Sequence, residues 1–304
     1  MDYSNCFSFS NYLWISLTQK CQWRCTYCDH PSIVNPVTCT EEQLLSVITM
    51  LNNLQEYRKN TEILLEGGEI GLIDSNILDL IFNSNVSDKY SITTNGLFMK
   101  NGFHKQYEDK IRYILYHVMP EIENKSFEYY NDTSIPIQYT VVVHKQNIQQ
   151  FATLLDNNPN CMFLPHFLQP RRTDLNFMNE QDFITIYNII KDRNNVFDFI
   201  KLRLKFIIKL LNKKQFVNNL QLKCQQIMTK TMINIPTNSI HRCCVSMQSS
   251  KIELTEVNLK NILQNTNIFP NTDTEMCLNC ISSNVFMDLY SGQNYSFYCK
   301  ILNI

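Results

Sequence analysis

Short apolar or β-branched runs alternate with longer amphipathic segments through the first half of the chain. Apolar runs of this length predict strands, whereas apolar residues recurring every three or four positions predict helices. The predicted strands are 12–18, 61–66, 90–94, 111–118, 136–144 and 161–168. The predicted helices are 41–59, 74–84, 101–109, 124–131 and 147–157. This alternation favours parallel strands joined by crossover helices, which defines an α/β fold.

The first of these helices carries a start signal in its sequence. Thr40 and Gln43 have the spacing of a capping box, in which each side chain bonds a backbone amide at the helix start. We therefore expect the helix to begin immediately after Thr40.

The pattern becomes helical beyond about residue 170, with predicted helices at 180–192 and 196–222. The second helix is amphipathic and basic. Such a helix either docks an acidic peptide or membrane surface, or presents a solvated face over a core, and the second arrangement is the more common. Its basic residues are Lys201, Arg203, Lys205, Lys209, Lys213 and Lys214.

Composition narrows the class of protein. The 304 residues suit one large domain and a smaller one, and a net charge of −1 gives no reason to expect nucleic acid. No apolar stretch approaches the roughly 20 residues of a membrane span, and the start lacks the features of a secretory signal. The twelve cysteines then indicate metal binding in a reducing, cytoplasmic setting, where disulfides are disfavoured.

The most specific signal is the run of Cys21, Cys25 and Cys28. Thiolates hold iron–sulfur clusters, and three thiolates on a four-iron cluster leave one iron open for another ligand. The alternative is a structural zinc site, which needs a fourth ligand from elsewhere.

Glycines mark two turns at the ends of predicted strands. Only six glycines occur in the chain, and Gly67, Gly68 and Gly71 lie together after the strand at 61–66. Gly96 closes the run Thr94-Asn95-Gly96 after the next strand. Glycine serves in ordinary turns, and it also lets a ligand approach the backbone closely.

With Tyr27 as the aromatic residue, the pattern Cys-x3-Cys-x-aromatic-Cys resembles the cluster loop of radical S-adenosylmethionine (SAM) enzymes. The resemblance implies that SAM chelates the open iron of a [4Fe-4S] cluster and that Tyr27 packs on its adenine. It implies reductive cleavage of SAM to a 5′-deoxyadenosyl radical, which abstracts a hydrogen atom from substrate. A partner such as flavodoxin or ferredoxin would supply the electron.

The glycine turns fit the same family. Gly67-Gly68-Glu69 resembles its GGE motif, which holds the SAM amino group, although Ile70 stands where proline is common. Thr94-Asn95-Gly96 resembles the turn after the third strand, so Thr94 and Asn95 are also expected near SAM. The implied fold is a partial (β/α)6 TIM-like barrel, with these motifs at the carboxyl ends of the first three strands.

A second cysteine set lies in the last third of the chain. A hairpin is predicted from Met232 to Cys243, and the four expected ligands resemble those of a twitch domain, the short form of the SPASM extension. A second [4Fe-4S] cluster or a four-sulfur zinc site fits them equally by spacing. The ligands are Cys224, Cys243, Cys277 and Cys280. The predicted domains are 1–170 (barrel), 171–223 (helical connection) and 224–304 (twitch-like, α+β).

The sequence leaves the substrate open between two classes. Enzymes of this layout modify ribosomally made peptides, by epimerisation or crosslinking, or oxidise small molecules such as aminoglycoside precursors. Cys244 resembles the hydrogen-atom donor of peptide epimerases, which favours a peptide, whereas a first strand near Tyr12 leaves no room for an N-terminal peptide-recognition domain. A hypothesis of another class is a non-catalytic metal-binding module, which does not explain the GGE motif.

Further candidates remain unranked. Acid–base residues expected near the barrel mouth are Glu66, His117, Glu121, His144, His166 and Arg171. His30 follows the cluster loop, and Cys6, Cys39 and Cys161 are expected to be small core or surface residues.

Overall fold

The computed structural model describes residues 11–25, 28, 33–59, 61–119, 130, 132–167, 178–198, 200–202, 204–205, 208, 230–241 and 251–264. The chain divides into two compact units, which are described separately. The first comprises Met1–Tyr116, Asn131–Ile137 and Gln225–Asp273; the second comprises His117–Tyr130, Gln138–Cys224 and Thr274–Ile304.

The first unit is built on parallel strands. Strands β1 (Asn11–Thr18), β2 (Thr61–Gly67), β3 (Tyr90–Thr94) and β4 (Ile111–Val118) pair in that order, each parallel to the next. Parallel neighbours bring their carboxyl ends to one edge of the sheet, where ligand sites of such folds lie.

A three-stranded extension continues the sheet beyond β1. Strand β7 (Lys230–Asn234) pairs parallel with β1, and β8 (Ser239–His241) and β9 (Lys251–Glu253) follow antiparallel. This is the hairpin predicted from Met232. It lacks a turn glycine, and Asn238 takes the left-handed conformation instead, with φ of 49°. Asparagine tolerates that region better than most residues.

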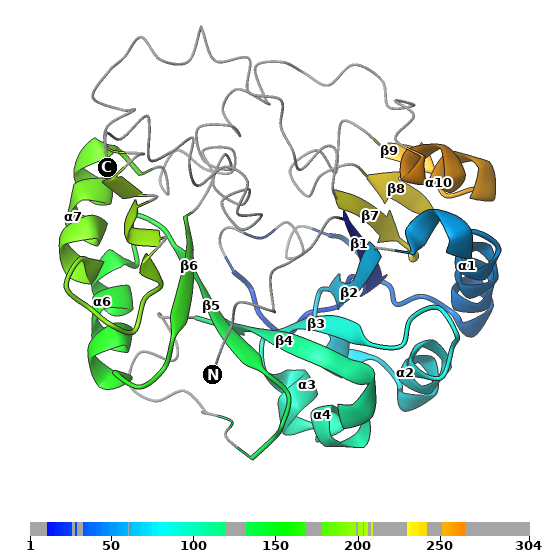
Figure 1. Cartoon of the computed structure of the whole chain (residues 1–304), viewed down its shortest axis with the longest axis horizontal. Coiled ribbons are helices and arrows are strands. Elements are labelled where there is room, and N and C mark those ends of the chain that lie inside the picture. The colour runs from blue at the N-terminus through cyan, green and yellow to red at the C-terminus, as the bar shows by residue number, and fades with distance from the viewer. Residues whose placement is uncertain are drawn as a thin grey trace, which may run out of the picture. The chain divides into compact units, whose positions relative to one another are not determined.

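Helices follow most of these strands. The helical elements of the first unit are α1 (Glu41–Asn53), η3 (Gln55–Arg58), η4 (Ile70–Leu72), α2 (Ser75–Phe82), α3 (Leu97–Lys100), α4 (Phe103–Gln106), η5 (Glu108–Lys110) and α10 (Glu256–Leu263). The expected capping box opens α1, because Thr40 Oγ1 accepts from Gln43 N at 3.2 Å and Gln43 Oε1 accepts from Thr40 N at 2.9 Å. Helices α1 and α2 contact each other and flank the strands (Figure 1).

The two faces of β1 and β2 differ in polarity. Leu13 and Ile15 lie opposite Ile63 and Leu65 across the strand pair, and all four are fully buried. Alternation along a strand places Ser16 and Glu66, which are also opposite each other, on the other face. The first face forms the core under the helices, and the second offers polar groups near the strand ends.

The described part of the second unit contains a parallel strand pair and helical segments. Strand β5 (Ile137–Val143) pairs with β6 (Phe163–Phe167), and α6 (Ile148–Asn157) contacts α7 (Glu180–Ile190). Between residues 198 and 208, the described positions are helical, as expected for that segment. No helix in the described ranges is long and apolar enough to cross a membrane.

All six predicted strands are present, but two helix predictions were wrong in extent. The predicted helix 41–59 ends at Asn53 and continues as the 3-10 turn η3. The predicted helix 101–109 is replaced by the shorter elements α4 and η5. Gly102, which separates α4 from the preceding α3, adopts φ of 78°, outside the helical region. The predicted helix 124–131 lies almost entirely outside the described residues.

Candidate cluster and cofactor site

The three predicted ligands lie on the loop that directly follows β1. Cys21, Cys25 and Cys28 are all half-buried. A backbone hydrogen bond from Cys28 N to Cys25 O, 3.1 Å long, forms a turn between the second and third cysteines. Tyr27, which precedes Cys28 in the sequence, is outside the described residues.

The returning chain closes the base of the cysteine loop. Gln19 N donates to Val37 O at 2.8 Å, and Cys39 N donates to Leu17 O at 2.9 Å. The hydroxyl groups of Thr18 and Thr38 are bonded at 2.8 Å between these two contacts. The loop is therefore anchored to the end of β1 on both sides.

The glycine turn after β2 packs directly against the cysteine loop. Gly68 N donates to Thr18 O at 2.7 Å, and Glu69 N donates to Lys20 O at 2.8 Å. A Cβ atom on Gly68 would collide with the Lys20 carbonyl, and Gly67 adopts φ of 145°. The two glycines are thus needed for close approach of two backbones, one step before Cys21.

Glu69 joins the β2 turn to the β3 turn. Its Oε1 atom accepts hydrogen bonds from Gly71 N (2.8 Å), Thr94 Oγ1 (2.7 Å) and Phe98 N (3.2 Å). Its Oε2 atom accepts from Asn95 N at 2.7 Å. The side chain is 1% exposed; burial raises its pKa, and these four hydrogen bonds act in the opposite direction.

Two N–H groups point at the sulfur of Cys21. Trp23 N lies 3.4 Å from Cys21 Sγ, and Asn95 Nδ2 lies 3.6 Å from it. Burial raises the pKa of the Cys21 thiol, and the nearby Glu69 carboxylate and Cys28 thiol raise it further, whereas the two donors lower it. Cys21 therefore lies among acidic groups and has hydrogen-bond donors ready for a thiolate.

These residues fit an iron–sulfur cluster. Crowded thiolates and a carboxylate are stabilised by cationic iron, and N–H donors to a ligating sulfur are usual around such clusters. Within the described residues no three His, Cys, Asp or Glu side chains converge as ligands of a single metal ion. The ligands of a four-iron cluster need not converge on one point, because each thiolate binds a separate iron.

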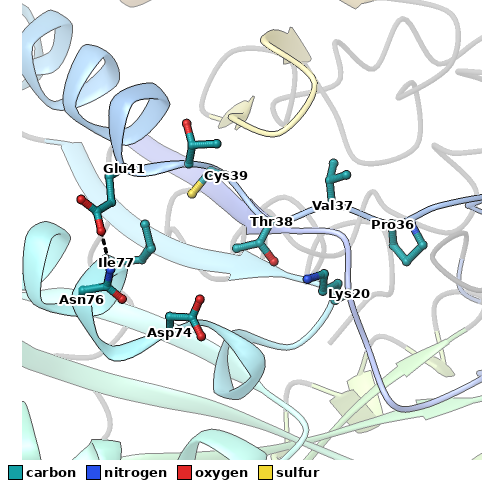
Figure 2. A pocket seen from close by; sticks show the side chains of 10 residues that line it. Lys20, Pro36, Val37, Thr38, Cys39, Glu41, Asp74, Asn76 and Ile77 are labelled. Carbon is teal, nitrogen blue, oxygen red and sulfur yellow. Dashed lines mark hydrogen bonds between the residues drawn. The ribbon is translucent and has the colours of Figure 1, made fainter.

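A pocket of about 440 Å³ lies beside the loop (Figure 2). Asp74, Asn76 and Ile77 at the start of α2 form one side, and Asn76 Nδ2 donates to Glu41 across it. The remaining lining residues are Lys20, Pro36, Val37, Thr38, Cys39 and Thr40. Cys39 is buried there and Cys161 is buried elsewhere, which confirms both as core residues.

Some of the other predicted site residues lie within the part of the chain that the structure describes, and the rest lie outside it. His117 Nδ1 lies 2.8 Å from Thr140 Oγ1, and burial lowers the His117 pKa to about 4. Glu66 lies on β2, His166 on β6, and His144 is buried just after β5. Outside the described residues are His30, Glu121, Arg171, Cys6, Cys224, Cys243, Cys244, Cys277 and Cys280.

Sequence reasoning missed two residues of the site, Gln22 and Trp23. Gln22 Nε2 donates to Asn95 Oδ1 at 2.8 Å, so a residue between the cysteines of the motif contacts the β3 turn. Neither residue belongs to the pattern that identified the loop, and no sequence signal marks a contact between residues 73 positions apart.

Solved structures share this fold, although no protein-family model and no curated protein sequence matches the chain. Streptococcus suis SuiB bound to precursor peptide SuiA has a TM-score of 0.57 and 16% identity, over 92% of this chain and 71% of that chain. Native anSMEcpe with bound AdoMet has a TM-score of 0.59 and 14% identity, over 95% and 96%. With AdoMet and Cp18Cys peptide, anSMEcpe has a TM-score of 0.57 and 13% identity, over 96% and 98%.

The chain shares the fold of these structures, which hold AdoMet, a peptide or both. The predicted fold class, a partial (β/α)6 barrel of parallel strands, is confirmed.

We predict that Gly68→Ala prevents cluster assembly at the cysteine loop. The added methyl group would collide with Lys20 O and displace the backbone next to Cys21, at a cost of about 1–3 kcal/mol. Gly102→Ala is the control for backbone strain alone: Gly102 has a φ of 78°, which alanine adopts poorly, but nothing lies within 4 Å of the added Cβ. The two variants are compared by the iron that each binds after anaerobic reconstitution, and circular dichroism checks that each is folded. Full iron uptake by Gly68→Ala would contradict the packing argument.

Proposed function

We propose that this chain is a radical SAM enzyme. The observation that carries the proposal is one hydrogen-bonded network, in which Glu69 bonds the β3 turn and its backbone bonds the loop of Cys21. The network unites three motifs that the sequence places after three successive strands. The shared fold of SAM-bound enzymes supports it independently.

In this proposal, Cys21, Cys25 and Cys28 hold a [4Fe-4S] cluster and its open iron takes SAM. When bound and reduced by a donor such as flavodoxin or ferredoxin, the cluster would supply the electron that cleaves SAM to a 5′-deoxyadenosyl radical. The chain orients SAM and excludes water from it. The SAM-contacting residues would be Tyr27, Gly67, Gly68, Glu69, Thr94 and Asn95.

Glu69 is suited to the SAM ammonium group through its Oε2 atom. Oε1 accepts three hydrogen bonds, whereas Oε2 accepts one from Asn95 N. A carboxylate oxygen has two lone pairs, so Oε2 can accept a second, charged donor. The three bonds on Oε1 hold the carboxylate in a fixed orientation toward it.

For the substrate, we infer a peptide. The SuiB structure contains a precursor peptide and one anSMEcpe structure contains a Cp18Cys peptide, and both share the fold of this chain. Modification would then be epimerisation or crosslinking of a ribosomally made peptide.

We further propose an auxiliary [4Fe-4S] cluster on Cys224, Cys243, Cys277 and Cys280. Among the described residues, the β7–β8 hairpin supports this proposal, because it ends at His241, two residues before Cys243. The competing structural zinc site would use the same four sulfurs.

Replacing Cys21, Cys25 and Cys28 together by Ala tests both metal sites. Wild-type protein reconstituted anaerobically should bind about eight irons, and the triple variant should bind about four, because separate sites lose metal independently. Iron, sulfide and zinc analysis provides the measurement. SAM cleavage by the triple variant under dithionite would overturn the radical SAM assignment, and one zinc per chain would overturn only the auxiliary cluster.

Glu69→Gln should weaken SAM binding about ten- to a hundredfold, since a charge-assisted hydrogen bond contributes roughly 1.5–3 kcal/mol. Equilibrium dialysis of SAM with the reconstituted protein gives the affinity. Glu108→Gln is the control, because Glu108 also anchors a loop, through Ser134 N and Oγ, but takes no part in the network. Equal SAM affinity in both variants would remove Glu69 from the binding site.

Cys244→Ala tests whether this thiol returns a hydrogen atom to a substrate radical, which would invert a stereocentre. The variant should keep both clusters and still abstract hydrogen from the peptide, but should lose the inverted product. Chiral analysis of the peptide product, with deuterium uptake from solvent, reads this directly. Undiminished epimer from the variant, or a crosslinked product in place of an epimer, would rule out the donor role.

A further inference from the structure

The side chain of Asn95 bridges the cysteine loop and the β3 turn. Its Oδ1 atom accepts from Gln22 Nε2 at 2.8 Å, and its Nδ2 atom donates to Cys21 Sγ at 3.6 Å. Its backbone N–H is bonded separately to Glu69 Oε2. Asn95 therefore contacts the cysteine loop through its side chain and Glu69 through its backbone.

The orientation of the Asn95 amide is determined by its partners. The oxygen and nitrogen of an amide are assigned from the hydrogen bonds that they make. Gln22 Nε2 and, at 3.4 Å, Leu97 N both approach the oxygen side as donors. The NH2 group is consequently directed at the sulfur, where it acts as a donor.

Hydrogen bonds to a ligating sulfur control how readily a cluster is reduced. Reduction adds one electron, and part of the added negative charge resides on the sulfurs, where N–H donors stabilise it. Cys21 Sγ has a backbone donor, Trp23 N, and a side-chain donor, Asn95 Nδ2. Only the second is open to change by substitution.

We propose that Asn95 is a positioning residue that raises the reduction potential of the cluster held by Cys21, and that Gln22 fixes the orientation of its amide. This inference rests on the proposed function. It assigns to Asn95 a role toward the sulfur, distinct from contact with SAM. Gln22 acts indirectly, because its hydrogen bond orients and polarises the Asn95 amide.

Potentiometric titration with dithionite, followed by electron paramagnetic resonance of the signal that changes on SAM addition, tests the proposal. At a fixed potential without SAM, Asn95→Leu should lower the ratio of reduced to oxidised cluster about two- to tenfold, as loss of one hydrogen bond implies. A tenfold fall corresponds to 59 mV for one electron. Gln22→Ala should lower the ratio about twofold, through weaker polarisation of the amide.

Two further variants separate a donor role from a structural one. Asn95→Asp keeps the acceptor for Gln22 but places a carboxylate oxygen against the sulfur, so its ratio should fall below that of Asn95→Leu. Asn101→Leu removes an asparagine of the same segment that donates to Gly71 O at 2.8 Å and should match the wild type.

The outcomes distinguish the inference from the proposed function. A wild-type protein without any SAM-sensitive signal refutes the proposed function itself. A wild-type signal together with an unchanged ratio in Asn95→Leu overturns only the role of Asn95. Should Asn95→Leu take up no cluster, Gln22→Ala decides, and an unchanged ratio in that variant overturns the inference.

Discussion

The buried carboxylate of Glu69 is the constraint on which the described site depends. Removing a carboxylate from water costs several kcal/mol, and only well-placed donors offset that cost. The donors come from the β2 turn (Gly71 N) and the β3 turn (Thr94 Oγ1, Asn95 N and Phe98 N). Neither turn can leave without exposing an unpaired charge in the interior. The two turns therefore hold each other in place before any ligand binds.

The same carboxylate gives the site its electrostatic character. Burial raises the pKa of the Cys21 thiol, and the nearby Glu69 carboxylate and Cys28 thiol raise it further through like charge. Acidic groups gathered in a partly buried place favour cationic ligands. Iron and the ammonium and sulfonium groups of SAM are all cationic. The proposed ligands would therefore reduce the repulsion between the acidic groups around Cys21.

The sequence predicted strand positions well because β1 to β6 are continuous apolar runs with clear borders. It predicted the cysteine loop and the glycine turns because those motifs need particular residues: Gly68 for close backbone approach, and cysteines for metal. It could not predict where helices break, since Gly102 reads as an ordinary turn or helix residue until its φ of 78° is known. The contact of Gln22 with Asn95 could not be predicted from the sequence either, because long-range pairing of two polar residues leaves no periodic signal.

The direction of β8 places a geometric condition on the C-terminal cysteines. Strand β7 runs parallel to β1, with Asn234 opposite Ser16 near the strand end that carries the cysteine loop. Strand β8 runs back, so that His241 is level with Met232, which itself lies opposite Trp14. The chain thus leaves β8 moving away from the loop of Cys21. A residue spans at most about 3.6 Å, so Cys244 reaches the strand ends only if the intervening chain turns back immediately. The ligand role of Cys243 carries no such condition, because an auxiliary cluster need not lie at the barrel mouth.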